Sequence, residues 1–380
     1  MRYRPYPRIV IGFIVLMVLL FSLNNSGAAL SPSDGKNTAN DAALKLVRFC
    51  FDPKAGFDEQ TVSTLVDHIL RVKQAPESGL PKSMGSTGAY YEFDIKTTLP
   101  RLVDYAYNRL IPQVITRPSS LRHSEWRAPA GEMQELPASW EGLGHGGKPV
   151  IIHGIQLDSN TPDLSTGVYH EQEMKRTLIL LNHKGRQVMI SVSKQIGTSK
   201  VGKKGAIIGE DTDWNYYYSG QAGATIAGFG WAKSYIYDYF SVAVFVESTT
   251  SSATVRSGVF QWLRAGWSGI NFVKESHILT GMRRFGRDFK AVLESPRLPA
   301  YHQMTSIYHG LSNKSDGELT KEYSNLLQAQ RSLALQAGKI SRAEGEKKLS
   351  LAGISRDQMV EELMLERLKS TLGKPTLLGK

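Results

Sequence analysis

Carboxylates and aromatic side chains gather in one short segment, and this combination is typical of sites that bind or cleave sugars. Asp211 and Asp213 stand beside Trp214, and Tyr216 and Tyr218 follow. Two carboxylates about 5–9.5 Å apart across a cleft supply the acid and the base or nucleophile of glycoside hydrolysis. The two aspartates are therefore the catalytic candidates, and the three aromatic residues are the ligand-binding candidates.

The same acidic residues also match the start of a calcium-binding loop. Asp211, Asp213 and Asn215 fit the pattern D-x-D-x-N, but Tyr216 occupies the position that needs glycine and Ala222 the position that needs glutamate. A turn whose side chains cap backbone groups explains the segment better. We predict neither a metal nor a cofactor for this chain.

Two further segments match catalytic motifs only in part. The stretch GTSKVGKK, residues 197–204, resembles a phosphate-binding loop, but it ends in Lys204 instead of serine or threonine. Ser191 and Lys194 match S-x-x-K, but their surroundings are strand-like, and a strand points these two side chains to opposite faces. The sequence therefore favours a non-enzymatic role. It does not exclude an enzyme whose catalytic residues are far apart in the chain.

The segment from Gly258 to Lys290 is rich in aromatic and basic residues and predicts two amphipathic helices. Apolar residues between Val259 and Val273 fit one arc of a first helix. A second helix has its apolar face between Ile278 and Val292, and its opposite face carries Arg283, Arg284, Arg287 and Lys290. Such helices cover a sheet, and a basic amphipathic helix can also lie on an anionic membrane. Both interpretations stay open, and the four cations are the candidate membrane contacts.

Changes in residue pattern divide the chain into regions that must position these groups. We predict a helical region over 36–117 with a loop at Pro76–Tyr91, an irregular linker over 118–147 and a β-sheet domain with covering helices over 148–295. A helical tail follows over 315–372. The fold class predicted is α+β, with a central, mostly antiparallel sheet.

The N-terminal residues 1–28 predict export. Arg2, Arg4 and Arg8 precede an uncharged apolar run over 9–23, and small residues up to Ala28 follow. This is the pattern of a signal peptide cleaved after Ala28, or of a short uncleaved anchor. Both alternatives place the body of the protein in the periplasm or on the outer side of the inner membrane.

Composition sets the expected partners. The formal net charge is +11, which attracts anionic lipids and acidic envelope polymers, whereas export makes nucleic acid an unsuitable partner. Cys50 is the only cysteine, so no internal disulfide forms, and we predict that it is buried. The first hypothesis is an exported, membrane-proximal protein with a binding or structural role in the cell envelope. The alternative is an extracytoplasmic hydrolase acting on envelope polysaccharide or peptidoglycan.

One segment of the tail, about residues 331–354, resembles the SHOCT type of short C-terminal helical hairpin. The resemblance rests on six positions: Leu335, Gly338, Ile340, Glu344, Lys348 and Leu349. The chain departs from the family at Gly345, where a bulky residue is usual. The resemblance implies self-association or contact with a protein partner through the C-terminal helices, and not catalysis. A solvated helix pair is the alternative.

Overall fold

The computed structural model describes residues 39–71, 76–131, 133–142, 148–226, 230–248, 253–346 and 350–378. They belong to one compact unit, residues 38–380. The N-terminal segment that we interpret as a signal peptide or anchor lies outside the described residues. Within the described residues, no helix is both long enough and apolar enough to cross a membrane.

An antiparallel sheet forms the centre of this unit, and it has eight strands among the described residues. Their order is β1-β2-β13-β12-β7-β6-β4-β3, which leaves β3 at one edge. Their bounds are β1 Glu77–Ser83, β2 Ser86–Ile95, β3 Leu121–Arg127, β4 Val150–Asn160, β6 Glu171–His183, β7 Arg186–Gln195, β12 Tyr235–Glu247 and β13 Val255–Gly266. The sheet and its helices confirm the predicted α+β class.

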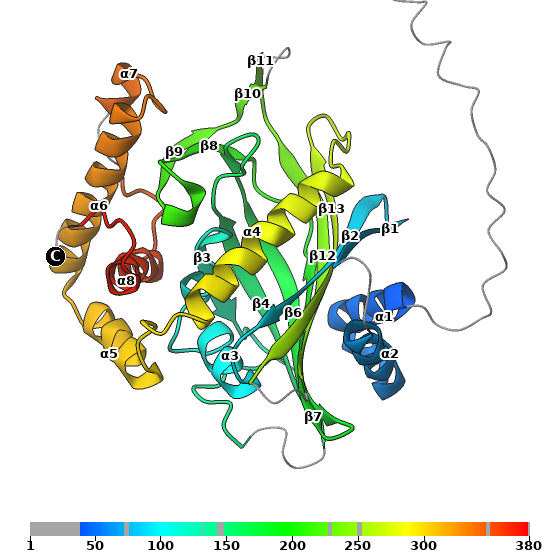
Figure 1. Cartoon of the computed structure of the whole chain (residues 1–380). Coiled ribbons are helices and arrows are strands. Elements are labelled where there is room, and N and C mark those ends of the chain that lie inside the picture. The colour runs from blue at the N-terminus through cyan, green and yellow to red at the C-terminus, as the bar shows by residue number, and fades with distance from the viewer. Residues whose placement is uncertain are drawn as a thin grey trace, which may run out of the picture. The chain divides into compact units, whose positions relative to one another are not determined.

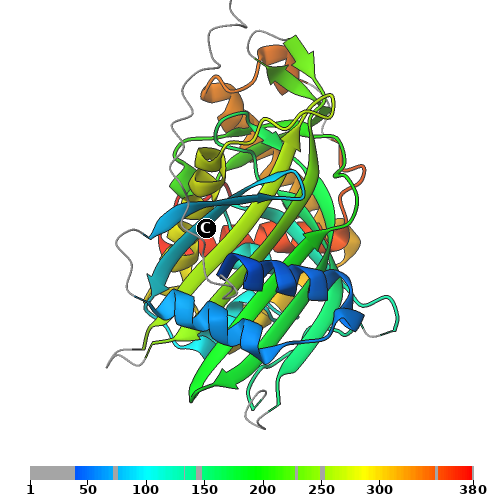
Figure 2. The ribbon, with the colours of Figure 1, turned by 90° about the vertical axis from the view of Figure 1, so that its right-hand side faces the viewer.

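Helices cover both faces of this sheet. Helices α1 (Ala39–Phe51) and α2 (Glu59–Leu70) lie across one face, and α3 (Leu99–Ala106) and α4 (Glu275–Leu293) lie across the other (Figures 1 and 2). Strand β12 shows why both are needed, because Val244 packs with α1 and α2 whereas Phe245 packs with α4. A strand that is apolar on both faces requires cover on both.

Smaller elements extend from the edge of the sheet. Strands β5 (Val168–Tyr169), β8 (Lys203–Ile207) and β9 (Tyr216–Ala222) form a second sheet, and β10 (Ala224–Ile226) pairs with β11 (Gly230–Ala232). The tail contains α5 (Tyr301–Ser312), α6 (Asp316–Gln336), α7 (Arg342–Gly345) and α8 (Arg356–Leu372). Helix α8 packs against α5, α6 and strand β3 (Figure 1). The predicted helical tail is therefore present, and it packs on the edge of the sheet.

The helix expected between Val259 and Val273 is wrong, because most of this segment is strand β13. The apolar residues that fit a helical arc also alternate along a strand: Phe260 and Trp262 face α1 and α2, and Val259 faces α4. Trp262 stacks on Phe240 of β12 with ring centroids 5.1 Å apart. Pairing with β12 and β2 decides between two periodicities that the local sequence fits equally well. The second expected helix is present as α4.

The loop expected at Pro76–Tyr91 is also wrong, because the hairpin of β1 and β2 occupies it. Met84 and Gly85 join the strands with φ values of 49° and 73°, as a two-residue hairpin turn requires. Methionine is not a usual residue at such a turn, so the signal in the sequence was weak. The predicted linker over 118–147 likewise contains a regular element, strand β3.

Candidate functional site

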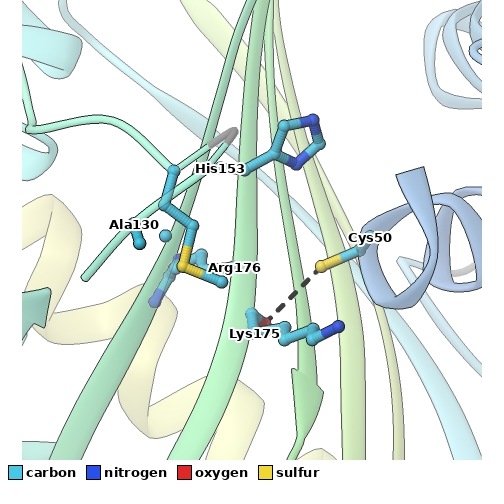
Figure 3. A pocket seen from close by; sticks show the side chains of 7 residues that line it. Cys50, Ala130, His153, Lys175 and Arg176 are labelled. Carbon is cyan, nitrogen blue, oxygen red and sulfur yellow. Dashed lines mark hydrogen bonds between the residues drawn. The ribbon is translucent and has the colours of Figure 1, made fainter. Parts of the chain in front are cut away.

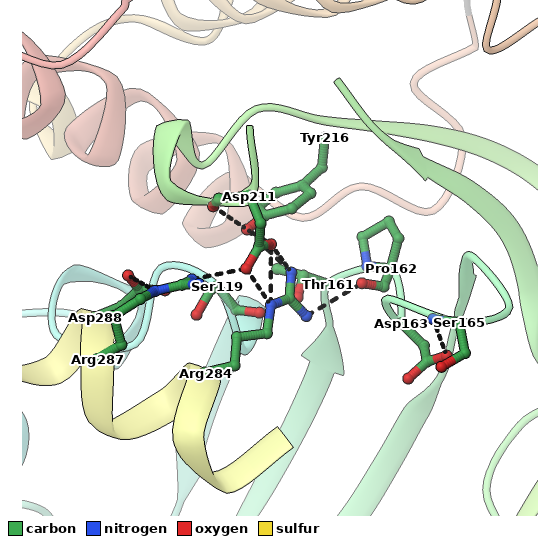
Figure 4. A network of polar contacts seen from close by, with 10 residues as sticks. All are labelled: Ser119, Thr161, Pro162, Asp163, Ser165, Asp211, Tyr216, Arg284, Arg287 and Asp288. Atoms are coloured by element: carbon green, nitrogen blue, oxygen red, sulfur yellow. Dashed lines mark hydrogen bonds and ion pairs between the residues drawn. The ribbon is translucent and has the colours of Figure 1, made fainter. Parts of the chain in front are cut away.

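The basic residues of α4 are held in ion pairs with other parts of the chain. Arg284 is only 8 % exposed, and its Nε donates a hydrogen bond to Asp211 Oδ2 at 2.9 Å. Arg287 Nη2 donates to the same oxygen at 2.7 Å and also pairs with Asp288 (Figure 4). Membrane contact by Arg284 is therefore wrong, since its guanidinium is enclosed between α4 and the turn that carries Asp211.

The other cations of this helix are more accessible but mostly neutralised. Arg283 is exposed, and its Nε donates to Glu77 of β1 at 2.8 Å. Lys290 is half-buried. Contact of Arg283, Arg287 and Lys290 with an anionic surface stays a prediction, and it would have to compete with these ion pairs.

Asp211 serves to hold α4 in the structure. Burial opposes ionisation of its carboxyl group, but hydrogen bonds from Arg284 and Arg287 outweigh that effect and lower its pKa. Asp211 and Asp213 both lie on the 3-10 turn Asp211–Asp213 and not on opposite walls of a cleft. The turn expected from the calcium-loop comparison is present, and this pair does not have the arrangement of a glycosidase.

The three aromatic candidates lie in three different environments. Trp214 is buried in a left-handed backbone conformation, with Lys374 Nζ 4.0 Å from the centre of its ring. Tyr216 is buried and accepts a hydrogen bond from Arg284 at 3.1 Å. Tyr218 lines a separate pocket together with residues of β3, β4 and β6 of the main sheet. The structure therefore retains one of the three as a ligand-binding candidate.

We call this cavity the tail pocket, because the C-terminal helices form one of its walls. It has a volume of about 550 Å³ and is lined by the ends of β3, β4 and β6, by β8 and β9, by α6 and by residues 350–355. This volume falls within the range of small-molecule binding sites. The residues that line it come from segments more than 200 positions apart in the chain, such as Arg122 and Gln330.

His123 and Glu361 join two walls of the tail pocket. His123 Nδ1 lies 3.0 Å from Glu361 Oε2, and the same carboxylate accepts the backbone N–H of Ser124 at 3.0 Å. Burial opposes protonation of the imidazole, but the hydrogen bond and charge of Glu361, with the charge of Glu362, raise the His123 pKa above its ordinary value. This pair fixes the ring, so that its other nitrogen has a defined position.

Arg122 and Glu362 form a second connection next to the first. Arg122 Nε donates to Glu362 Oε1 at 2.8 Å, and the hydroxyl of Tyr323 on α6 donates to the same oxygen at 2.9 Å. The guanidinium carbon of Arg122 lies 3.8 Å from the centre of the Tyr218 ring. These contacts fix β3, α6, α8 and β9 relative to one another, so the pocket wall is rigid.

Four polar side chains of low overall exposure line the tail pocket. They belong to His123, Asp158, Ser159 and Gln330, which are between 4 % and 8 % exposed. Asp158 Oδ1 accepts a hydrogen bond from Gln156 at 2.7 Å. None of the four side chains has an atom among the enclosed polar atoms that lack a partner in the described part of the chain, so their remaining polar atoms are open to the pocket.

The segments with partial motifs have structural roles. Residues 197–204 lead into strand β8 and not into a helix, and Lys203 and Lys204 pair with Glu171 and Glu344 at 2.6 and 2.8 Å. Ser191 and Lys194 lie on strand β7, where Ser191 accepts hydrogen bonds from Arg176 and Lys194 pairs with Asp238. Neither segment forms the catalytic arrangement of the motif it resembles.

The hairpin segment of the tail contacts the chain's own second sheet. Ile340 is buried with Ile208 and Tyr217, and Glu344 forms the ion pair with Lys204. Lys348 and Leu349 lie outside the described residues. The resemblance to SHOCT hairpins and a role in partner contact stay predictions.

A smaller cavity of about 210 Å³ lies beside α1, next to Cys50, His153 and Lys175 (Figure 3). Cys50 is buried as predicted, and its Sγ donates to the Lys175 carbonyl at 3.5 Å. Burial raises the pKa of this thiol to about 11, which keeps it protonated and unreactive. Among the described residues, no three His, Cys, Asp or Glu side chains come together to hold a metal ion.

Sequence reasoning missed the tail pocket. Strand β3 was interpreted as part of a linker, and Gln330 and Glu361 as part of a helical tail. None of its buried polar residues belongs to a motif. Tyr218 was the one lining residue selected from the sequence as a ligand-binding candidate. It was selected because it lies close to Asp211 in the sequence, and Asp211 does not line the pocket.

No family model matches the chain, and no curated protein matches it. Solved structures show limited similarity. Human StAR-related lipid transfer protein 5 shares 7% identity over 62% of this chain and 94% of that one, with a TM-score of 0.31. An uncharacterised protein from Rhizobium leguminosarum shares 12% over 57% and 97%, with a TM-score of 0.25. The human StarD13 lipid transfer and protein localization domain shares 7% over 62% and 98%, with a TM-score of 0.27. Similarity at these TM-scores identifies neither a family nor a ligand for this chain.

Proposed function

We propose that this chain is an exported, membrane-proximal binding protein of the cell envelope, without enzymatic activity, whose ligand occupies the tail pocket. The observation that carries this proposal is the tail pocket itself, a cavity of about 550 Å³ whose lining includes the polar side chains of His123, Asp158 and Gln330. Tyrosine rings from β5 and β9 line it as well. A cavity of this size with a few convergent polar groups is the usual form of a small-molecule site.

The setting of the proposal rests on the sequence. The N-terminal pattern over 1–28 supports export, and the net charge of +11 supports attraction to an anionic membrane surface or envelope polymer. The C-terminal helices remain candidates for contact with a second copy or a protein partner. Such a contact would have to use the faces of α6 and α8 that do not line the tail pocket.

A second candidate function, a hydrolase of envelope polysaccharide, now depends on different residues. His123 is the candidate general base, since Glu361 holds its Nδ1 and both His123 and Asp158 line the pocket. Incubation with peptidoglycan or soluble oligosaccharides would show new reducing ends if the protein is a hydrolase. Their loss in a His123→Gln variant would favour this function over simple binding.

The binding proposal is tested by thermal stability in the presence of small molecules from the host. A ligand present at 100 times its Kd stabilises the folded state by about 2.7 kcal/mol, which raises Tm by roughly 4 °C for a unit of this size. We expect this rise with the small-molecule fraction of the host envelope for the wild-type protein and for Gln60→Leu, an exposed amide on α2. Gln330→Leu should show much less. An equal rise in Gln330→Leu, or none in the wild type, would contradict the proposal.

A further inference from the structure

We infer that one end of the main sheet is the surface with which this protein contacts a membrane, by placing exposed apolar side chains among anionic lipid headgroups. The inference rests on the proposed function, because it specifies which surface of a membrane-proximal protein meets the lipid. It comes from three properties of this end of the sheet: its exposed apolar side chains, the lysine that stands beside them, and the rigidity of a connection that carries them.

Large apolar side chains are exposed on three connections of the chain. Met84, in the turn between β1 and β2, and Ile270, in the connection from β13 to α4, are each 55 % exposed. Phe272 in the same connection and Trp231 on β11 are exposed as well. Exposed apolar side chains that gather on one surface mark a site of interaction. We call these four residues, with the connections that carry them, the apolar tip.

Strand pairing brings the three connections to the same end of the main sheet. Leu263, near the end of β13, pairs with Thr87, near the start of β2. Gly266, the last residue of β13, pairs with Tyr235, the first residue of β12. The turn before β2, the connection after β13 and the segment that leads into β12 therefore leave the sheet at one end (Figure 1). Two of them are also in contact, since the Thr87 hydroxyl donates to the Val273 carbonyl at 3.0 Å.

Each of the three connections carries an exposed lysine two positions from an exposed apolar residue. The pairs are Lys82 with Met84, Lys233 with Trp231, and Lys274 with Phe272. Among the described residues, no carboxylate forms an ion pair with these three lysines, in contrast to the arginines of α4. Glu275 stands next to Lys274, but its carboxylate lies against Gly79 of β1. The apolar tip therefore carries positive charge that can reach lipid phosphate without breaking an ion pair.

The connection from β13 to α4 is held in one conformation by its own hydrogen bonds. Asn271 Oδ1 accepts the backbone N–H of Ala265 at 3.2 Å and that of Val273 at 3.0 Å. The backbone N–H of Gly269 donates to the hydroxyl of Tyr237 on β12 at 2.8 Å. The apolar side chains of this connection are thus exposed on an ordered backbone. Their insertion into lipid would order little additional chain, which lowers the entropic cost of binding.

An anionic membrane fits this surface better than a protein partner does. Lysine is depleted at the centre of protein–protein interfaces, whereas here a lysine accompanies the apolar side chains of every connection. Lysine and tryptophan are both suited to the headgroup region of a bilayer, where the apolar part of a side chain enters the lipid and its polar end stays in water. Anionic lipids would add attraction to the three ammonium groups.

A fluorescent probe at the apolar tip tests this inference in the full chain. An environment-sensitive fluorophore is attached to Ile270→Cys. The matched control carries it at Lys184→Cys, in the exposed turn between β6 and β7 at the opposite end of the sheet. Cys50 is buried and does not compete for the label. Whether or not residues 9–23 hold the chain on a vesicle, a probe at position 270 reports on the tip itself.

The expected result depends on both the position of the probe and the charge of the lipid. With phosphatidylcholine vesicles that contain about 30 % phosphatidylglycerol, emission at position 270 should rise about twofold or more and shift to shorter wavelength. Emission at position 184 should not change. Phosphatidylcholine alone should give a change at least about threefold smaller at position 270. The double variant Lys82→Gln with Lys274→Gln should weaken the change on anionic vesicles in the same direction.

The outcomes separate this inference from the proposed function. If the chain sediments with the vesicles but emission at position 270 stays constant, the apolar tip is not the contact, and the membrane-proximal setting stands. If the chain does not sediment with them, that setting is contradicted as well. Equal changes at positions 270 and 184 overturn the inference. A change at position 270 that follows protein concentration and not lipid overturns it in favour of a second copy. Met84→Cys is the second labelled position if the unfolding midpoint shows that Ile270→Cys is not folded.

Discussion

His123 and Glu361 are 238 residues apart in the sequence, and their side chains meet at 3.0 Å in the wall of the tail pocket. The contact joins β3, the edge strand of the sheet, to α8, the last helix of the tail. The contact makes the C-terminal helices part of the wall of the tail pocket.

This pair predicts a dependence of stability on pH. Burial disfavours the imidazolium ion, but Glu361 and Glu362 outweigh that effect and raise the His123 pKa above 6.5. A raised pKa in the folded state stabilises the protein fully below the unfolded value of about 6.5, and this stabilisation is lost as pH rises through the folded value. We expect the urea midpoint to fall as pH rises above about 6.5 through the raised folded-state pKa. The fall should be smaller in His123→Gln.

Titration of the ring by nuclear magnetic resonance provides the check. A His123 resonance that titrates at or below 6.5 would contradict the predicted raised pKa. An equal fall in the urea midpoint of His123→Gln would assign the effect to other histidines.

The ion pairs of α4 with Asp211 and with Glu77 should contribute unequally to the free energy of unfolding. Asp211→Asn leaves the buried Arg284 without its carboxylate, and we expect a loss of about 3 kcal/mol of unfolding free energy. Glu77→Gln removes the partner of the exposed Arg283 and should cost less than about 1 kcal/mol. Urea unfolding measures both. Similar small losses in the two variants would show that Asp211 does not hold α4 in place.

The thiol of Cys50 should react with a disulfide reagent only after the protein unfolds. Its pKa of about 11 and its position on the buried face of α1 leave little accessible thiolate at pH about 8, so modification by a disulfide reagent should be at least about 100-fold slower in the native protein than in urea. The rate is followed by absorbance of the released thiol. Fast reaction of the native protein would place Cys50 at an accessible surface.

The N-terminal segment predicts a processed or anchored protein in the host. Cleavage after Ala28 should give an intact mass that starts at Ala29, and salt should release the protein if its basic residues hold it to the membrane. An unprocessed mass that stays in the membrane after a salt wash would identify residues 9–23 as the anchor. An unprocessed, cytoplasmic protein would contradict export.

The sequence predicted the elements whose periodicity is unambiguous. Helix α4 followed from the spacing of Ile278, Met282 and Phe285. Strand β13 was mistaken for a helix because Phe260 and Trp262 also fit a helical arc, and only pairing with distant strands decides between the two. Local sequence carries no information about such pairing.

The site was harder to predict for the same reason. Asp211 was noticed because aromatic residues follow it, but its partners, Arg284 and Arg287, come more than 70 residues later. The tail pocket brings together His123, Asp158, Gln330 and Glu361, each of which stands in an ordinary local context. Their common feature is burial around one cavity, and this is a property of the folded chain.

The native mass of the protein purified from its own host tests the central claim most directly. Wild-type protein, kept in non-denaturing buffer, should carry a small non-covalent ligand that is released on unfolding. The double variant Asp158→Asn with Gln330→Leu, folded by its unfolding midpoint, should lack this ligand, and Gln60→Leu should retain it. The same adduct on the double variant, or the bare mass for the wild type, would contradict the assignment of the tail pocket as the ligand site.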